Sequence, residues 1–167
     1  LGIITIVSSI TGTILAGSAV DFLRNKNYSD APVRAAMIAV LLALPPVVLL
    51  SFVQSEFAAW ACIALYLLFI SSFAPLGLLA ISGVSAGSVK GQLAAVHAFL
   101  MMAFGLSLGP QITAFFTDFI FMDSDRLNWS ISLTGAIVLP ISAYLFKISL
   151  PKYAESSERI KNGLSLD

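Results

Sequence analysis

Few residues in this chain are of a type that does acid–base or nucleophilic chemistry. His97 is the single histidine and Cys62 the single cysteine among 167 residues. The run Gly83–Gly87 spells G-x-S-x-G, the nucleophile elbow of serine hydrolases, with Ser85 in the position of the nucleophile. An elbow lies between a strand and a helix, whereas this run ends a long apolar segment. We therefore interpret it as a small-residue turn, with a membrane-embedded serine hydrolase built on Ser85 and His97 as the minor alternative.

The composition of the chain indicates whether these residues lie in water or in a lipid bilayer. Hydrophobic residues make up 58% of the chain and charged residues 11%, against about 25% charged residues in a typical soluble domain. This composition predicts an integral membrane protein surrounded by a lipid bilayer. The formal net charge is zero, which argues against a nucleic-acid partner. One cysteine excludes an intrachain disulfide and a cysteine metal cluster, and we expect neither a metal site nor an enzyme.

Five apolar stretches are long enough to cross a bilayer, which takes about 20 residues in helical form. Backbone polar groups in lipid must be satisfied within the segment, so all five should be helices. The predicted fold class is therefore an all-α, polytopic transmembrane bundle, followed by a polar tail over residues 151–167. The predicted spans are residues 2–20, 35–53, 57–84, 92–116 and 130–150.

Lysine and arginine are distributed unevenly between the two ends of these spans. Only Arg126 lies on one side, and the other lysines and arginines lie on the side of the first predicted loop and the tail. By the positive-inside rule, that loop and the C-terminus are cytoplasmic. Leu1 already lies in an apolar run, without a preceding Met or signal-peptide pattern. We therefore expect a fragment whose N-terminal part is missing. The cytoplasmic cations are Arg24, Lys26, Arg34, Lys90, Lys147, Lys152, Arg159 and Lys161.

The first span has a face of small and hydroxyl residues. Thr5, Ser8 and Gly12 recur at spacings of three and four, which places them on one side of a helix. Small faces let membrane helices approach closely. We therefore predict that this face packs against protein or lines a cavity, with Gly12 at a helix contact.

The second and fourth spans differ in their content of small and hydroxyl residues. The fourth carries Gly105 and Gly109 as a GxxxG motif, followed directly by Pro110, and these residues are predicted to pack against another helix. The second has no glycine, and no hydroxyl residue before Ser51. We predict that the fourth span faces protein or a cavity and that the second faces lipid.

A few polar residues inside the spans are candidates for lining a cavity or contacting a substrate. His97 lies about five residues into the fourth span, and an ionisable group at membrane depth is a functional candidate by default. Histidine also titrates near neutral pH, so it suits a proton site. A hydrogen bond near the lipid headgroups is the alternative for His97, and core packing is the alternative for the others. The remaining candidates are Thr5, Ser8, Tyr66 and Gln111.

The end of the first span resembles the loop signature of the major facilitator superfamily, roughly G-x-x-x-D-R-x-G-R-R. Gly17, Asp21 and Lys26 match that pattern. Phe22 replaces the first arginine, and Arg24 stands where glycine is usual. A match this degenerate is typical of the second copy of the signature, between the eighth and ninth helices of the family.

Two later stretches resemble the same family in the same register. Lys90 and Gly91 resemble the cytoplasmic entry into the eleventh helix. Gly105, Gly109 and Pro110 resemble a G-x-x-x-G-P segment of that helix. The likeness is to the spinster-like and organophosphate-type branches, and it covers the whole chain as the eighth to twelfth helices.

The resemblance implies a secondary transporter that moves a small-molecule substrate by alternating access. The chain would be the second six-helix half without its first helix, with the missing N-terminal half of the same protein as its partner. The first, third and fourth spans would line the cavity, and the second and fifth would support them. No cofactor is implied, although a coupling proton or other ion stays open.

The resemblance also implies a role for the loop and a location. Asp21, with Arg24 and Lys26, would brace the outward-facing state, while a solvated loop that only enforces topology is the alternative. A bacterial inner membrane is the expected location. A non-transporting membrane scaffold or receptor is the alternative function.

Overall fold

The computed structural model describes residues 2–85, 89–122 and 127–161. This part of the chain is helical and contains no strand, which confirms the predicted all-α class. The α-helices are α1 (Gly2–Asn25), α2 (Ala31–Leu49), α3 (Glu56–Ile70), α4 (Phe73–Gly83), α5 (Lys90–Leu100), α6 (Ser107–Phe115) and α7 (Leu127–Lys161). Two segments are π-helical, η1 (Met101–Leu106) and η2 (Phe116–Phe121).

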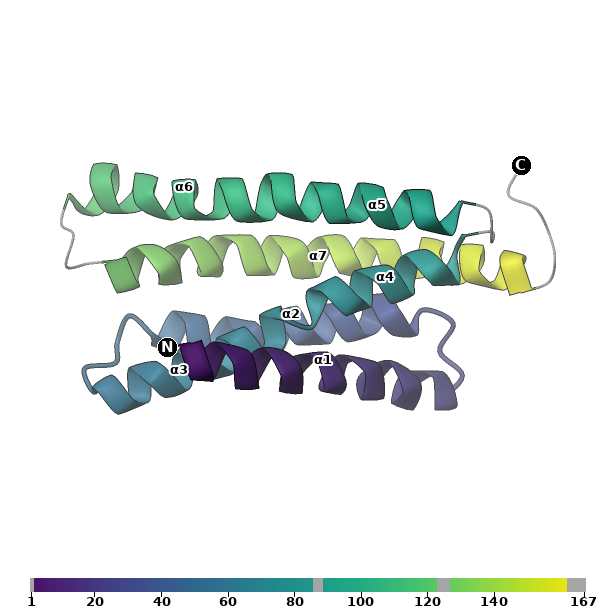
Figure 1. The fold of residues 1–167 in the computed structure, drawn as a ribbon, viewed down its shortest axis with the longest axis horizontal. Coiled ribbons are helices and arrows are strands. Elements are labelled where there is room, and N and C mark those ends of the chain that lie inside the picture. Colours follow the sequence, from purple (N-terminus) through teal and green to yellow (C-terminus); the bar gives the residue numbers. More distant parts are fainter. Residues whose placement is uncertain (1, 86–88, 123–126, 162–167) are drawn as a thin grey trace.

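The helices run lengthwise, and their direction alternates from one span to the next (Figure 1). The α1–α2 turn, the start of α5 and the end of α7 lie at one end of the molecule, and the α2–α3 turn and the start of α7 lie at the other. By length and composition, this is an integral membrane protein. In the described part of the chain, five spans are long and apolar enough to cross a membrane: Gly2–Asn25, Ala31–Leu49, Glu56–Gly83, Lys90–Ile120 and Leu127–Ile160.

Helix α2 is the central helix and packs against α1, α3, α4 and α7. The prediction that this span faces lipid is wrong for the face that carries Ala35, Ala39 and Ala43, which are at most 8% exposed. Residues four apart share a helix face, and alanine is small enough to let another helix approach. Leu41 and Leu42 lie on the other side and are about half-exposed. Alanine, rather than glycine or a hydroxyl residue, therefore makes the packing face of the central helix.

Helix α1 packs through its small-residue face. Ser8, Gly12 and Ala16 are buried on this side of the helix. At Gly12 the backbone of α3 is so close that a Cβ atom would collide with the carbonyl oxygen of Leu68. At the same crossing, Ser72 Oγ donates a hydrogen bond of 3.0 Å to the Gly12 carbonyl oxygen. Glycine is thus required where α1 crosses the third span.

The third span is divided into two helices, because α3 ends at Ile70 and α4 begins at Phe73. Pro75 explains the break. It has no N–H, and a proline ring clashes with the carbonyl group four residues earlier, here that of Ser71. Because the helix is interrupted at this point, the side chain of Ser72 can reach α1.

The fourth span is the outer layer of the bundle and packs on α4 and α7 (Figure 1). Pro110 cannot donate a hydrogen bond to the carbonyl group of residue 106, and the helix is π-helical up to that residue. Nothing lies within 4 Å of a Cβ atom built on Gly105 or Gly109. In the described part of the chain, no other helix therefore packs closely against Gly105 and Gly109, contrary to the prediction from the GxxxG motif.

Helix α7 continues through Pro151 to Lys161, eleven residues beyond the predicted end of the fifth span at residue 150. Hydroxyl groups connect it to its neighbours at both ends. Ser132 Oγ donates a hydrogen bond of 2.7 Å to the carbonyl oxygen of Val47 on α2. Tyr153 Oη donates one of 2.9 Å to the carbonyl oxygen of Ala80 on α4. The polar tail therefore begins as part of the bundle.

Candidate functional site

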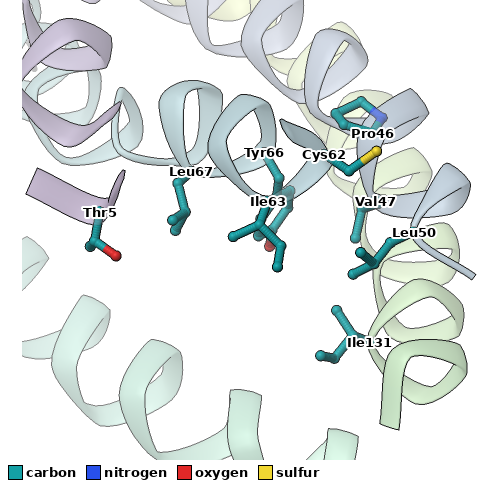
Figure 2. A pocket seen from close by; sticks show the side chains of 9 residues that line it. All are labelled: Thr5, Pro46, Val47, Leu50, Cys62, Ile63, Tyr66, Leu67 and Ile131. Atoms are coloured by element: carbon teal, nitrogen blue, oxygen red, sulfur yellow. The ribbon is translucent and has the colours of Figure 1, made fainter. Parts of the chain in front are cut away.

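A cavity of about 310 Å³ lies between α1, α2, α3 and α7, toward the end of the bundle where α3 begins. Figure 2 shows α3 as one wall, with Leu50 and Ile131 facing it from the other side of the opening. The lining is mainly aliphatic and aromatic, as in most small-molecule sites. The lining residues are Thr5, Pro46, Val47, Leu50, Cys62, Ile63, Tyr66, Leu67 and Ile131.

Two residues predicted to line a cavity meet here. Thr5 comes from α1 and Tyr66 from α3, and both are labelled in Figure 2. Their hydroxyl groups and the thiol of half-buried Cys62 are the polar side-chain groups of the lining. A charged ligand would find no countercharge on these walls. The cavity therefore suits a small, mainly apolar solute.

The other predicted cavity residues lie elsewhere. Ser8 is buried on α1 but does not line this cavity. Gln111 is exposed on α6. His97 is on α5, where its imidazole lies against Gly77 of α4. The structure thus brings together two of the five predicted residues. The grouping of the five could not be predicted, because spacing along the chain does not show which spans are neighbours.

Ser85 has a structural hydrogen bond. Its Oγ donates a bond of 2.6 Å to the carbonyl oxygen of Ile81 in the last turn of α4. The serine therefore follows a helix, not the strand that a nucleophile elbow requires. Residues 86–88 of that run lie outside the described residues. In the part of the chain that the structure describes, no three His, Cys, Asp or Glu residues are placed to hold a metal ion.

The α1–α2 turn is an ordered hydrogen-bonded turn. Asn27 has a φ of 62°, in the left-handed region. The N–H of Tyr28 donates to the carbonyl oxygen of Leu23 at 3.2 Å, and that of Asn27 donates to the carbonyl oxygen of Arg24 at 2.9 Å. This is the Schellman arrangement, in which asparagine can replace glycine. Helix α1 therefore extends past the predicted boundary and includes Asp21 and Arg24.

The acid with a close partner at this turn is Asp30. It is 5% exposed and accepts two hydrogen bonds from Arg34, at 3.2 Å from Nε and 2.9 Å from a terminal nitrogen. The guanidinium group also lies over the ring of Tyr28, 4.2 Å from its centroid. Bidentate pairs of this kind hold both partners in one geometry. The pair was not predicted from the sequence, although an acid four residues before an arginine at the start of an apolar helix is a recognisable signal.

The residues of the family signature are not gathered into one cluster. A Cβ atom built on Gly17 would have nothing within 4 Å. Asp21 is exposed and takes part in none of the ion pairs in the described part of the chain. Lys26 lies over the ring of Phe22, 4.5 Å from its centroid. Asp21 on α1 and Lys26, which follows the end of α1, therefore do not form an ion pair with each other.

A second, more polar cavity of about 310 Å³ lies between this turn and α7. Arg24 lines it, together with Tyr153 and the buried Ser157. Ser29, also in its lining, donates a hydrogen bond of 2.9 Å to a carboxylate oxygen of Glu158. The hydroxyl groups of Tyr153 and Ser29 thus already donate hydrogen bonds within the protein. The bond from Ser29 connects the turn to α7, so the role of these groups is structural.

The predicted entry to the fourth span coincides with the start of α5. Lys90 is its first residue and is exposed. A Cβ atom on Gly91 would have nothing within 4 Å. Both residues therefore lie at the surface, at the end of the molecule that also holds the α1–α2 turn (Figure 1).

Comparisons with protein-family models, curated proteins and solved structures find no match to this chain. A functional proposal therefore rests on the residues and geometry of the chain itself.

Proposed function

We propose that this chain is part of a secondary transporter that moves a small solute across a membrane by alternating access. The observation that carries the proposal is the cavity of Figure 2, which lies between four of the five membrane-length spans. One wall of the cavity is α3, the helix that ends at the break before α4. Many transporters form their substrate sites beside discontinuous helices.

We further propose a major-facilitator-type fold of the spinster-like or organophosphate-type branch. The support is the resemblance at Gly17, Asp21 and Lys26 and at the start of α5. The alternating direction of the five spans agrees with the order expected for the eighth to twelfth helices. The N-terminal half of the same protein is the partner that this proposal requires.

The proposed orientation has the cation-rich end in the cytoplasm. Arg24, Lys26 and Arg34 lie at the α1–α2 turn, and the start of α5 and the end of α7 carry further cations at that same end (Figure 1). The positive-inside rule assigns such an end to the cytoplasm. The C-terminus is then cytoplasmic, and a bacterial inner membrane is the proposed location.

The solute class follows from the lining. The walls carry no charged side chain, and their exposed surface is almost entirely apolar. A small, mainly apolar solute is therefore the proposed substrate. The proposal needs no cofactor, and a coupling proton or other ion would act outside this lining.

Solute flux tests the proposal. The full-length protein is reconstituted into liposomes loaded with a mixed pool of small amphipathic metabolites, and efflux is followed by mass spectrometry. We expect at least one solute to leave faster than from protein-free liposomes, with a rate that saturates as its concentration rises. If no solute leaves faster, the protein is not a transporter of that class.

A non-transporting scaffold or receptor is the second candidate function. The observation that favours it is the cavity lining, in which no charged group is present to couple movement to an ion. A scaffold would bind in this cavity without moving the bound molecule. Binding without flux in the same liposomes would therefore support it.

A further inference from the structure

The polar cavity between the α1–α2 turn and α7 contains hydrogen-bond donors that the protein itself does not use. Its volume is about 310 Å³, and it lies at the end of the bundle that also holds the start of α5 (Figure 1). The hydroxyl groups of Ser29 and Tyr153 each donate a hydrogen bond within the protein. Two other donors of the lining, the guanidinium group of Arg24 and the hydroxyl group of Ser157, make no such bond among the described residues.

Ser157 is buried, yet its hydroxyl group has no protein partner. The residue is 6% exposed. The preceding Ser156 Oγ donates a hydrogen bond of 3.0 Å to the carbonyl oxygen of Lys152, the usual bond of a serine inside a helix. Ser157 Oγ makes no corresponding bond, and this oxygen is not sealed off from the surface as His97 Nε2 is. Because Ser157 lines the cavity, its hydroxyl group is available to a ligand there.

The carboxylates next to the cavity already have partners. Asp30 accepts two hydrogen bonds from Arg34. Glu158 accepts one from Ser29 at 2.9 Å. Neither acid is therefore left to pair with a further cation.

Arg24 is a cation without a carboxylate partner. None of the ion pairs in the described part of the chain includes it, although Asp21 lies three residues earlier on the same helix. Its positive charge lies close enough to Tyr153 to act electrostatically on the tyrosine hydroxyl group, and both residues line the cavity. The cavity therefore has a positive charge that no neighbouring acid neutralises.

An anion with at least three oxygens fits this pair of donors. The planar guanidinium group donates two parallel hydrogen bonds to a carboxylate or a phosphate group. Both oxygens of a carboxylate would be taken by such a fork, whereas a phosphate group has a further oxygen for a donor on another helix. Arg24 on α1 and Ser157 on α7 supply these donors from two helices.

We propose that this cavity binds a phosphate group, with Arg24 on two of its oxygens and Ser157 on a third. Because the cavity lies where the spans end, a soluble phosphate ester and a phospholipid headgroup can both reach it (Figure 1). The site is separate from the cavity of Figure 2 and shares no lining residue with it. It is independent of transport, since a protein that moves nothing could still hold this ligand.

Native mass spectrometry of the full-length protein tests the site and the source of the phosphate group. The protein is kept in dodecyl maltoside, a detergent without phosphate. Glycerol phosphate is titrated in one series and dioctanoyl phosphatidylglycerol in another. Glycerate and dioctanoylglycerol are their respective controls, because the first has a carboxylate in place of the phosphate and the second has no anionic group.

We expect at least one phosphate compound to bind saturably, and its control to bind at least about tenfold more weakly. Binding of glycerol phosphate would support the site and indicate a soluble ester. Binding of phosphatidylglycerol alone would support it and indicate a lipid headgroup. No saturable binding of either compound, or equal binding of a compound and its control, would overturn the proposal.

Matched variants test the two contacts. Arg24→Gln and Ser157→Ala should each weaken binding of the phosphate compound about tenfold or more, because each loses a hydrogen bond to a charged group. Arg159→Gln and Ser156→Ala are the controls, since neither residue lines the cavity and Arg159 pairs with Glu155 at 2.9 Å. Equal affinities within both pairs would contradict the proposed contacts. If Arg24→Gln does not fold, the two serine variants still decide the question.

Discussion

Two glycines on different spans show how much the importance of the same residue type depends on its position. At Gly12 a Cβ atom would collide with the backbone of α3, whereas at Gly105 it would have nothing within 4 Å. We expect Gly12→Val to lower the free energy of unfolding by about 1–3 kcal/mol, because an overpacked contact forces the helices apart. Gly105→Val should change it by less than about 0.5 kcal/mol. Reversible unfolding of both variants in one detergent measures the difference, and equal losses would show that α1 and α3 do not touch as described.

Two carboxylates near the α1–α2 turn, Asp30 and Asp21, allow a second comparison of a buried with an exposed residue. Asp30 is buried and holds Arg34 through two hydrogen bonds, whereas Asp21 is exposed. Asp30→Asn should lower the free energy of unfolding by about 1–3 kcal/mol, because it weakens a charged pair in a partly buried place. Asp21→Asn should stay within about 0.5 kcal/mol of the unaltered protein. A larger loss for Asp21→Asn would contradict the assignment of Asp30 as the structural acid.

The same Asp21 variant tests the bracing role that the family resemblance implies. A carboxylate that makes an interaction in only one conformation shifts the equilibrium between conformations. Its loss need not change the free energy of unfolding. Flux through Asp21→Asn in proteoliposomes should therefore fall although its unfolding does not change. Unchanged flux would mean that the loop only enforces topology.

At the scale of the helices, the hydroxyl group of Tyr153 joins the end of α7 to α4. Its hydrogen bond to the carbonyl oxygen of Ala80 is 2.9 Å long. Tyr153→Phe should increase amide hydrogen exchange over residues 151–161 several-fold, because a single hydrogen bond contributes about 0.5–1.5 kcal/mol. Tyr144→Phe is the control, since Tyr144 is 64% exposed on the same helix. If both variants exchange alike, the end of α7 is held by other contacts.

The order of the five spans could be predicted from hydropathy alone, because a membrane span needs a long apolar run. The helix ends could not, because α1 and α7 carry charged residues within their last turns. The burial of α2 was also missed. Its alanines allow close approach as glycine does, but alanine is too common in helices to mark a contact.

Little of the candidate site could be read along the chain. Thr5 and Tyr66 were predicted as cavity residues from their polarity, and they meet because α1 and α3 cross at Gly12. The His97–Gly77 contact joins two spans, and no pattern within either span signals it. Pairing between spans depends on which helices are neighbours, and hydropathy carries no such information.

At the scale of the whole molecule, the alternating spans predict which residues lie on opposite sides of the membrane. Lys152 is exposed at the α1–α2 end, and Phe57, at the start of α3, is 85% exposed at the other end. In a Cys62→Ala background, Lys152→Cys should react with a membrane-impermeant maleimide only from the cytoplasmic side. Phe57→Cys should react only from the opposite side. Labelling of both from the same side would contradict the alternating arrangement.

The measurement that tests the central claim most directly is solute flux in the full-length protein when the cavity of Figure 2 is filled. Ile63→Trp adds a large ring to the lining, whereas Ile10→Trp adds the same ring at a site on α1 that is 57% exposed. The proposed mechanism predicts that Ile63→Trp loses at least about nine-tenths of the flux, equivalent to about 1.4 kcal/mol, and that Ile10→Trp keeps most of it. Equal flux in the two variants would show that the solute does not pass through this cavity.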